Sequence, residues 1–190
     1  MHLSDIHFQT GVAGKAFDLD NDVRNELVRD ARVVCAQLKQ SVDFILVTGD
    51  IAYFGIEQEY KIANDWLIDL CKKVGCSPGK IFVIPGNHDI DWKVIERSAA
   101  LRHVQTGIRK AGAEALDKQI ADALGDPETA SMLFRPLSAY NDFASSFECT
   151  CGPDNVWWSN DHELGHGFSL RLLGLTSILW CQALRIRKGT

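Results

Sequence analysis

The amino-terminal half of the chain alternates short apolar runs with longer segments of helical spacing. Runs of strand length occur at residues 42–48 and 80–84, and His2-Leu3-Ser4 predicts the end of an earlier strand. Parallel strands need a crossover helix between them, so this order is typical of an α/β fold with a parallel sheet. The apolar positions of the two intervening helices are Val23, Leu27, Ala31, Val34, Cys35 and Leu38, then Ala63, Trp66, Leu67, Leu70, Cys71 and Val74.

Residues 92–150 no longer alternate, and helical spacing predominates there. Asp126-Pro127 predicts a helix start, with the aspartate as cap and the proline in the first turn. We interpret this segment as a helical insertion within a single domain that covers residues 1–190. Three positions share one predicted helix face, namely Leu116, Ile120 and Leu124.

The last part of the chain carries weaker signals. We expect a loop at residues 149–167, because Gly152-Pro153 and polar residues interrupt any periodicity. Residues 168–177 return to strand character. The basic side chains of Arg185, Arg187 and Lys188 are interpreted as a solvated face.

Composition narrows the function classes. A length of 190 residues corresponds to about one domain. Twenty basic and 25 acidic residues give a net charge of −5, which opposes a role as a pure nucleic-acid-binding module. No apolar run approaches the roughly 20 residues of a membrane span, and polar residues appear from His2 onward, so neither a membrane partner nor a signal peptide is expected. Cysteines within helical patterns favour reduced thiols and a cytoplasmic location.

Polar clusters follow each of the three predicted strands. Because ligands of open α/β sheets bind outside the carboxyl ends of the strands, these clusters are expected to share one rim. Their side chains offer oxygen and nitrogen ligands, which suit Mn²⁺, Fe or Zn²⁺. Two such ions about 3.5–4 Å apart would activate a water and clamp a phosphate. The clusters are Asp5-Ile6-His7, Gly49-Asp50 and Gly86-Asn87-His88-Asp89.

These three motifs, in this order, resemble the first half of the signature of the calcineurin-like metallophosphoesterases, in particular its bacterial members. The resemblance covers roughly residues 1–91 and the strand at 168–177. It implies an α/β fold: part of a two-sheet sandwich flanked by helices, with the helical insertion at its side.

The resemblance also implies a site with two divalent metal ions, Mn, Fe or Zn. Asp5 and His7 correspond to ligands of the first ion, Asp50 to the bridge between the ions, and Asn87 to a ligand of the second. The family pattern further requires a later His and a Gly-His-x-His motif, which do not follow residue 177. We therefore expect the chain to be the amino-terminal part of a longer domain, with an incomplete second metal site and low activity in isolation.

Two further residues have implied catalytic roles. His88 corresponds to the histidine that contacts the phosphate and protonates the leaving group. Asp89 is expected to orient the imidazole of His88 through a hydrogen bond, as carboxylates around metal sites commonly do.

Other chemistry-bearing residues have less specific patterns. Tyr53 is expected to pack beside the site and not to bind metal. His162 and His166 are interpreted as solvated loop residues, although either could replace a missing ligand, and His103 as a surface residue. Zinc half-sites at Cys71/Cys76 and Cys149/Cys151 lack the usual two-residue spacing.

The predicted function is metal-dependent hydrolysis of phosphate esters, by a phosphodiesterase or a phosphatase. A metal-dependent nuclease with a nucleic-acid substrate is one alternative. A non-catalytic sensor, or a module that binds a protein partner or a further carboxyl-terminal domain, is the other.

Overall fold

The computed structural model describes residues 1–10, 19–176 and 178. Ser177 and the basic residues Arg185, Arg187 and Lys188 lie outside the described residues. The order of elements in the amino-terminal half is β1 (His2–Leu3), α1 (Leu19–Leu38), β2 (Ile45–Thr48), α2 (Glu57–Val74), η1 (Pro78–Lys80), β3 (Ile81–Ile84) and η2 (Asn87–Asp89). The remaining elements are α3 (Trp92–Arg97), α4 (Ala99–Lys110), α5 (Ala113–Gly125), α6 (Pro127–Phe134), η3 (Arg135–Leu137), α7 (Ser138–Ala144), η4 (Ser145–Phe147), β4 (Trp157–Gly165) and β5 (Phe168–Leu175).

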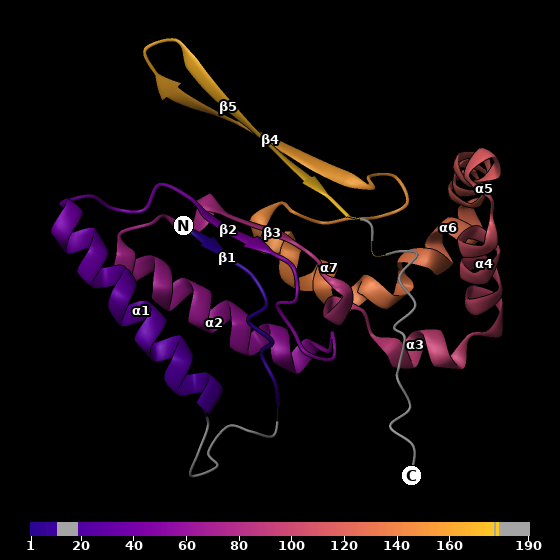
Figure 1. Cartoon of the computed structure of the whole chain (residues 1–190), viewed down its shortest axis with the longest axis horizontal. Coiled ribbons are helices and arrows are strands. Elements are labelled where there is room, and N and C mark those ends of the chain that lie inside the picture. Colours follow the sequence, from indigo (N-terminus) through magenta and orange to yellow (C-terminus); the bar gives the residue numbers. More distant parts are fainter. Residues whose placement is uncertain (11–18, 177, 179–190) are drawn as a thin grey trace.

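The first three strands form a parallel sheet in the order β1-β2-β3. Ile45 pairs with Ile81, and Val47 pairs with Val83. Side chains alternate along a strand, so these four share one face of the sheet, and all are buried. Helices cover one face of the sheet and the β4–β5 hairpin lies over the other, where Trp158 contacts Phe82 (Figure 1). β3 is buried along most of its length, whereas in β2 Leu46 is half-buried and Thr48 is exposed, so the predicted burial on both faces holds for β3 and only in part for β2.

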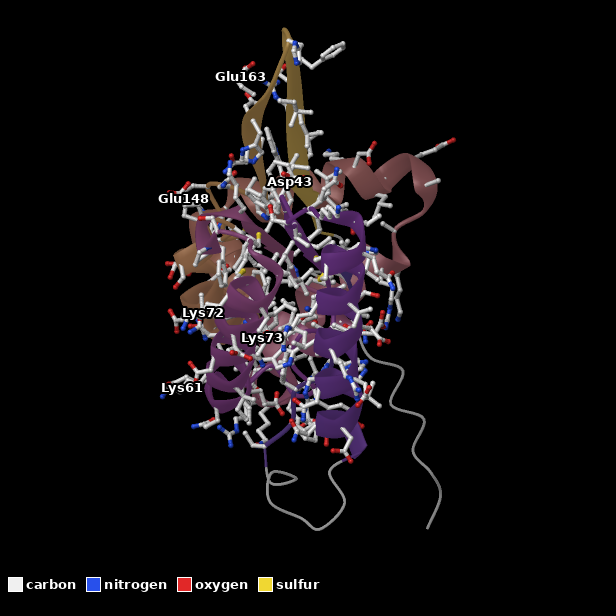
Figure 2. The ribbon with its side chains drawn as sticks, turned by 90° about the vertical axis from the view of Figure 1, so that its left-hand side faces the viewer. Asp43, Lys61, Lys72, Lys73, Glu148 and Glu163 are labelled. Carbon is white, nitrogen blue, oxygen red and sulfur yellow. The ribbon has the colours of Figure 1, made fainter. Side chains whose placement is uncertain are left out.

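The helix α2 has the predicted apolar face, and its far side is polar. Figure 2 shows Lys61, Lys72 and Lys73 along this helix, while its buried face packs under the sheet. Gly75 ends the helix as expected: it adopts φ 70° and its N–H donates to the carbonyl of Cys71.

The helix α1 is present where predicted, but its predicted apolar face is only partly covered. Val28 is buried, and Leu27, Ala31 and Cys35 are partly buried against the core. Three positions assigned to the same face are exposed, namely Val23, Val34 and Leu38. The helix packs along α2 at the edge of the fold, so its neighbour covers only a narrow stripe.

Residues 92–147 form helices α3 to α7, as the change of periodicity predicted. Asp126 caps α6 by accepting a hydrogen bond from the N–H of Thr129 at 2.9 Å. The helix α7 packs on α2, and Tyr140 donates from its hydroxyl to the carbonyl of Val83 at 3.1 Å. This end of the segment therefore belongs to the main core. That the segment is an insertion within the domain stays a prediction.

The expected loop at residues 149–167 is wrong over its second half, where β4 forms. This strand pairs antiparallel with β5, which matches the strand predicted from residue 168. Along β4 only Trp158 is buried, so no alternation of buried and exposed apolar residues marks the strand in the sequence. The turn needs left-handed backbone at Gly165, His166 and Gly167, with φ of 81°, 53° and 81°.

The hairpin projects from the body of the molecule, with Glu163 near its outer end in Figure 2. One of its attachments is the indole of Trp158, which packs against Phe82 and donates from Nε1 to the carbonyl of Val83 at 3.1 Å. Trp158 pairs with Gly174 across the hairpin, and a Cβ at Gly174 would lie 1.9 Å from the indole. Glycine is therefore required at this position for the indole to reach β3.

We predict that Gly174→Val lowers the free energy of unfolding by about 1–3 kcal/mol, because the added methyl groups displace a packed indole. Urea unfolding followed by tryptophan fluorescence measures this effect. The matched control is Gly107→Ala in α4, where a Cβ meets nothing within 4 Å. That change should raise the unfolding free energy by about 0.5–1 kcal/mol. Equal stability of Gly174→Val and the unmodified chain would contradict the proposed attachment.

Candidate metal centre

The site is built where the chain leaves β1 and β2, and its backbone there is unusual. Asp5, His7 and Asp50 all adopt left-handed conformations, with φ of 55°, 52° and 52°. The two segments stay side by side, since the N–H of Asp5 donates to Gly49 and that of His7 donates to the carbonyl of Asp50 at 2.9 Å. Left-handed backbone costs energy in residues other than glycine and persists where surrounding structure holds it. Three such residues lie together after β1 and β2, and strained backbone of this kind tends to cluster at functional sites.

His7, Asp50 and His88 converge. In the part of the chain that the structure describes, they form the group whose potential ligand atoms all lie within 4.8 Å of one another. Nε2 of His7 lies 4.0 Å from a carboxylate oxygen of Asp50, and the two imidazole rings are in edge contact at 4.6 Å between centroids. All three side chains are partly buried. The strand ends thus bring together residues that are 38 or more positions apart in the sequence.

The backbone carbonyl of Tyr53 determines the tautomer of the His88 imidazole. Nδ1 of His88 lies 2.9 Å from the carbonyl oxygen of Tyr53. A carbonyl can only accept, so Nδ1 carries the proton. Nε2 is left free to bind a metal ion or to exchange a proton with a substrate.

The donor set fits a transition metal or zinc. Two imidazoles and a carboxylate are ligands that Mn²⁺, Fe and Zn²⁺ share. Nδ1 of His7 is buried and has no hydrogen-bond partner among the described residues. The nitrogen of this ring that faces Asp50 is Nε2, so Nε2 is the atom available to an ion.

Asp50 is held in place by the turn that follows β3. One of its carboxylate oxygens accepts from the N–H of His88 at 2.9 Å. The turn approaches so closely that a Cβ at Gly86 would lie 2.2 Å from the same oxygen. Gly86 is therefore needed for Asp50 and His88 to meet.

The expected hydrogen bond from Asp89 to His88 is wrong. The carboxylate of Asp89 is fully buried and accepts from the N–H groups of Ile51, Ala52 and Gly86 at 2.8–3.1 Å and from the hydroxyl of Tyr60 at 2.9 Å. Its side chain turns into the protein, whereas that of His88 turns to the rim. Burial raises the pKa of Asp89 to about 6, although its four donors act in the opposite direction. The sequence contains no sign of this network, because its partners are mostly backbone groups.

The other predicted site residues are placed nearby but are not part of the three-residue group. Asp5 and Asn87 are exposed, the latter directly before His88. Their roles as ligands stay predictions. Tyr53 packs beside the site as expected, with its ring 5.8 Å from that of His7 and 5.2 Å from that of His88.

The two later histidines lie on the hairpin and not at the site. His162, expected in a solvated loop, is partly buried on β4 between Phe44 and Phe82, with Nδ1 3.0 Å from Nζ of Lys80. His166 is exposed at the turn. Neither belongs to the group formed by the described His7, Asp50 and His88.

Comparison with known proteins supports this picture. A model of the calcineurin-like phosphoesterase family matches residues 1–172. The chain belongs to the calcineurin-like phosphoesterase family. Its parallel and antiparallel sheets with flanking helices agree with the α/β fold expected from the motifs. Members of this family are metal-dependent phosphoester hydrolases, and the chain offers a His-Asp-His group to an ion.

One curated relative is the metallophosphoesterase-like protein YydB of Bacillus subtilis (strain 168), with 31% identity over 90 residues. These residues are 47% of this chain and 17% of that protein, so the match spans about a sixth of the relative's length. No solved structure matches the chain significantly. None of the helices in the described ranges is both long and apolar enough to cross a membrane.

We predict that Asp89→Asn destabilises the fold although it preserves the side-chain shape. The new amide group would face backbone N–H groups, and each buried donor without an acceptor costs about 1–3 kcal/mol. The control is Asp91→Asn, because Asp91 caps α3 from a less buried position and asparagine caps equally well. Thermal unfolding followed by circular dichroism should show a lower midpoint for Asp89→Asn alone. Unchanged midpoints for both variants would argue against the structural role of Asp89.

The cysteine pairs are thiols and do not form a zinc site among the described residues. Burial raises the pKa of Cys149 and of Cys151 to about 11, so little thiolate forms near neutral pH.

We predict that iodoacetamide at pH 8 labels Cys35 on α1 well before Cys149 and Cys151, as read by peptide mass spectrometry. All three should react at similar rates in denaturant. Rapid labelling of Cys149 in the folded chain would show that the segment after η4 is not packed as described.

Proposed function

We propose that this chain carries part of the active site of a phosphatase or phosphodiesterase that uses two divalent metal ions. The observation that carries the proposal is the convergence of His7, Asp50 and His88 at the strand ends. Family membership supports it, since the family's reaction is metal-dependent phosphoester hydrolysis. When bound, the ions supply an activated water and neutralise charge on the phosphate.

Asp5, His7, Asp50 and Asn87 are the proposed ligands. His7 and Asp50 would hold the first ion, with Asp5 reaching in from its exposed position in the same segment. Asp50 would also contact the second ion, together with Asn87. Further ligands of the second ion are expected from outside this set. Mn²⁺, Fe and Zn²⁺ all fit the donors.

His88 is the proposed catalytic residue. The hydrogen bond to the carbonyl of Tyr53 fixes its ring, so that Nε2 is directed to the rim. From there it can contact the phosphate and donate a proton to the departing oxygen. Asp89 acts on the reaction only through position: its bonds to Gly86, Ile51 and Ala52 hold the turn that presents His88.

The proposed partner is a phosphate-ester substrate, and the proposed location is the cytoplasm. Free thiols at Cys35, Cys71, Cys76, Cys149 and Cys151 support a reducing compartment. The net charge of −5 makes a nucleic-acid substrate the weaker alternative.

We predict slow hydrolysis of bis(p-nitrophenyl) phosphate or p-nitrophenyl phosphate by this chain in the presence of Mn²⁺, because its second metal site lacks ligands, and loss of this activity after EDTA. His88→Ala should lower kcat by about 10²–10⁴-fold, the usual contribution of an acid-base residue. His103→Ala is the control, because His103 is exposed on α4. Loss of activity in both variants would point to misfolding, and full activity of His88→Ala would refute its role.

Metal binding can be tested without turnover. We predict that calorimetric titration with Mn²⁺ gives one tighter site, and that Asp50→Ala weakens it at least tenfold because the ion loses its only anionic ligand in the three-residue group. Asp43→Ala, at an exposed residue labelled in Figure 2 ahead of β2, is the matched control. Hydrolysis and metal binding both absent in the unmodified chain would leave the non-catalytic binding module as the better interpretation.

A further inference from the structure

A pocket of about 740 Å³ opens beside His88. One side is the segment between β2 and α2, which contributes Tyr53 and Phe54. The other side is α3, which contributes Trp92 and Ile95. Since His88 lines the pocket and is the proposed proton donor, the pocket lies on the side from which the leaving group departs.

The pocket wall is aromatic from the imidazole outward. The ring of Tyr53 lies 5.2 Å from that of His88 and 4.7 Å from that of Phe54. Phe54 keeps 51% of its surface exposed, although the protein has an apolar core close by. An exposed aromatic ring at the mouth of a pocket is suited to stacking with a flat ligand. Trp92, on the opposite side, adds a second large ring.

Hydrogen bonds and close backbone packing hold both sides in place. The N–H of Phe54 donates to the carboxylate of the buried Glu59 at 2.8 Å. The next residue, Gly55, has φ 66°, and a Cβ there would lie 2.7 Å from the backbone of Ile90. On the other side, Arg102 donates from Nη1 to the carbonyls of Ile95 and Glu96 at the end of α3. A pocket fixed in this way loses little entropy when it binds a rigid ring.

The charges of the lining cancel. Lys93 and Arg102 are balanced by Asp91 and Glu96, and the guanidinium of Arg102 is already engaged by backbone carbonyls. A neutral lining favours an uncharged ligand part and does not form the basic track that a polynucleotide requires.

Resting on the proposed function, we propose that the substrate is a nucleotide whose nucleoside part is the leaving group. The base stacks against Phe54 and Trp92, and the phosphate lies at His88. In the reaction, a bond forms between phosphorus and the oxygen of water, and the bond from phosphorus to the nucleoside oxygen breaks. A proton passes to that oxygen, so nucleoside and phosphate are the products.

The test compares ligands that differ only in the base. With Mn²⁺ present, kcat/KM for adenosine 5′-monophosphate should exceed that for ribose 5-phosphate by roughly tenfold or more, the range expected from stacking one base. Without added metal, equilibrium dialysis should show binding of adenosine and no binding of ribose at the same concentration.

Substitutions in the pocket test whether it is the place where the base binds. Phe54→Leu and Trp92→Leu should each reduce adenosine binding by roughly fivefold or more, since each removes one stacking partner. Phe168→Leu is the matched control, at an aromatic residue that is 69% exposed on the hairpin, and should bind as the unmodified chain does. Circular dichroism verifies the folding of all three.

The outcomes separate the two proposals. Adenosine binding without hydrolysis of either phosphate would support the pocket and refute the catalytic proposal. Equal hydrolysis of both phosphates without adenosine binding would overturn the pocket and support the hydrolase. Tighter binding of a single-stranded oligonucleotide than of adenosine, with affinity falling steeply with salt, would also overturn the nucleotide proposal, in favour of a nucleic-acid substrate.

Discussion

The buried carboxylate of Asp89 is the interaction on which the arrangement of the site depends. It joins the segment after β2, through Ile51 and Ala52, to the turn after β3, through Gly86, and to α2, through Tyr60. A buried anion is costly unless donors surround it, and here four donors do so. The same contacts hold the turn that carries His88 against Asp50. The core and the rim of the site are therefore joined through one carboxylate.

Much of the fold could be predicted from the amino-acid sequence because burial and periodicity coincide in it. β2 and β3 are apolar on both faces, α2 has a clear apolar stripe, and Gly75 ends it where expected. The hairpin strand β4 could not be predicted, since its pairing with β5 satisfies the backbone while most of its side chains remain in water. Along α1 the apolar spacing was visible, but it did not indicate that the described residues leave Val34 and Leu38 exposed.

The candidate site was predictable to the extent that motifs follow strands. His7, Asp50 and His88 meet as their positions after β1, β2 and β3 indicated. The hydrogen-bond partners did not follow from the same pattern, because a backbone carbonyl, that of Tyr53, orients His88 and backbone N–H groups surround Asp89. Every residue has backbone N–H or carbonyl groups, so hydrogen bonds to them cannot be predicted from residue types. The aromatic pocket likewise arises from two segments, around Phe54 and Trp92, that only the tertiary structure brings together.

The left-handed backbone at Asp5, His7 and Asp50 has a consequence for how such a chain can be altered. Glycine adopts these φ values more readily than aspartate or histidine, so replacing Asp5 or His7 by glycine would relieve backbone strain. Each such exchange would remove a side chain that the proposed chemistry requires. Stability and activity therefore make opposite demands on these positions. A variant stabilised by glycine there would lack a side chain that the proposed chemistry needs.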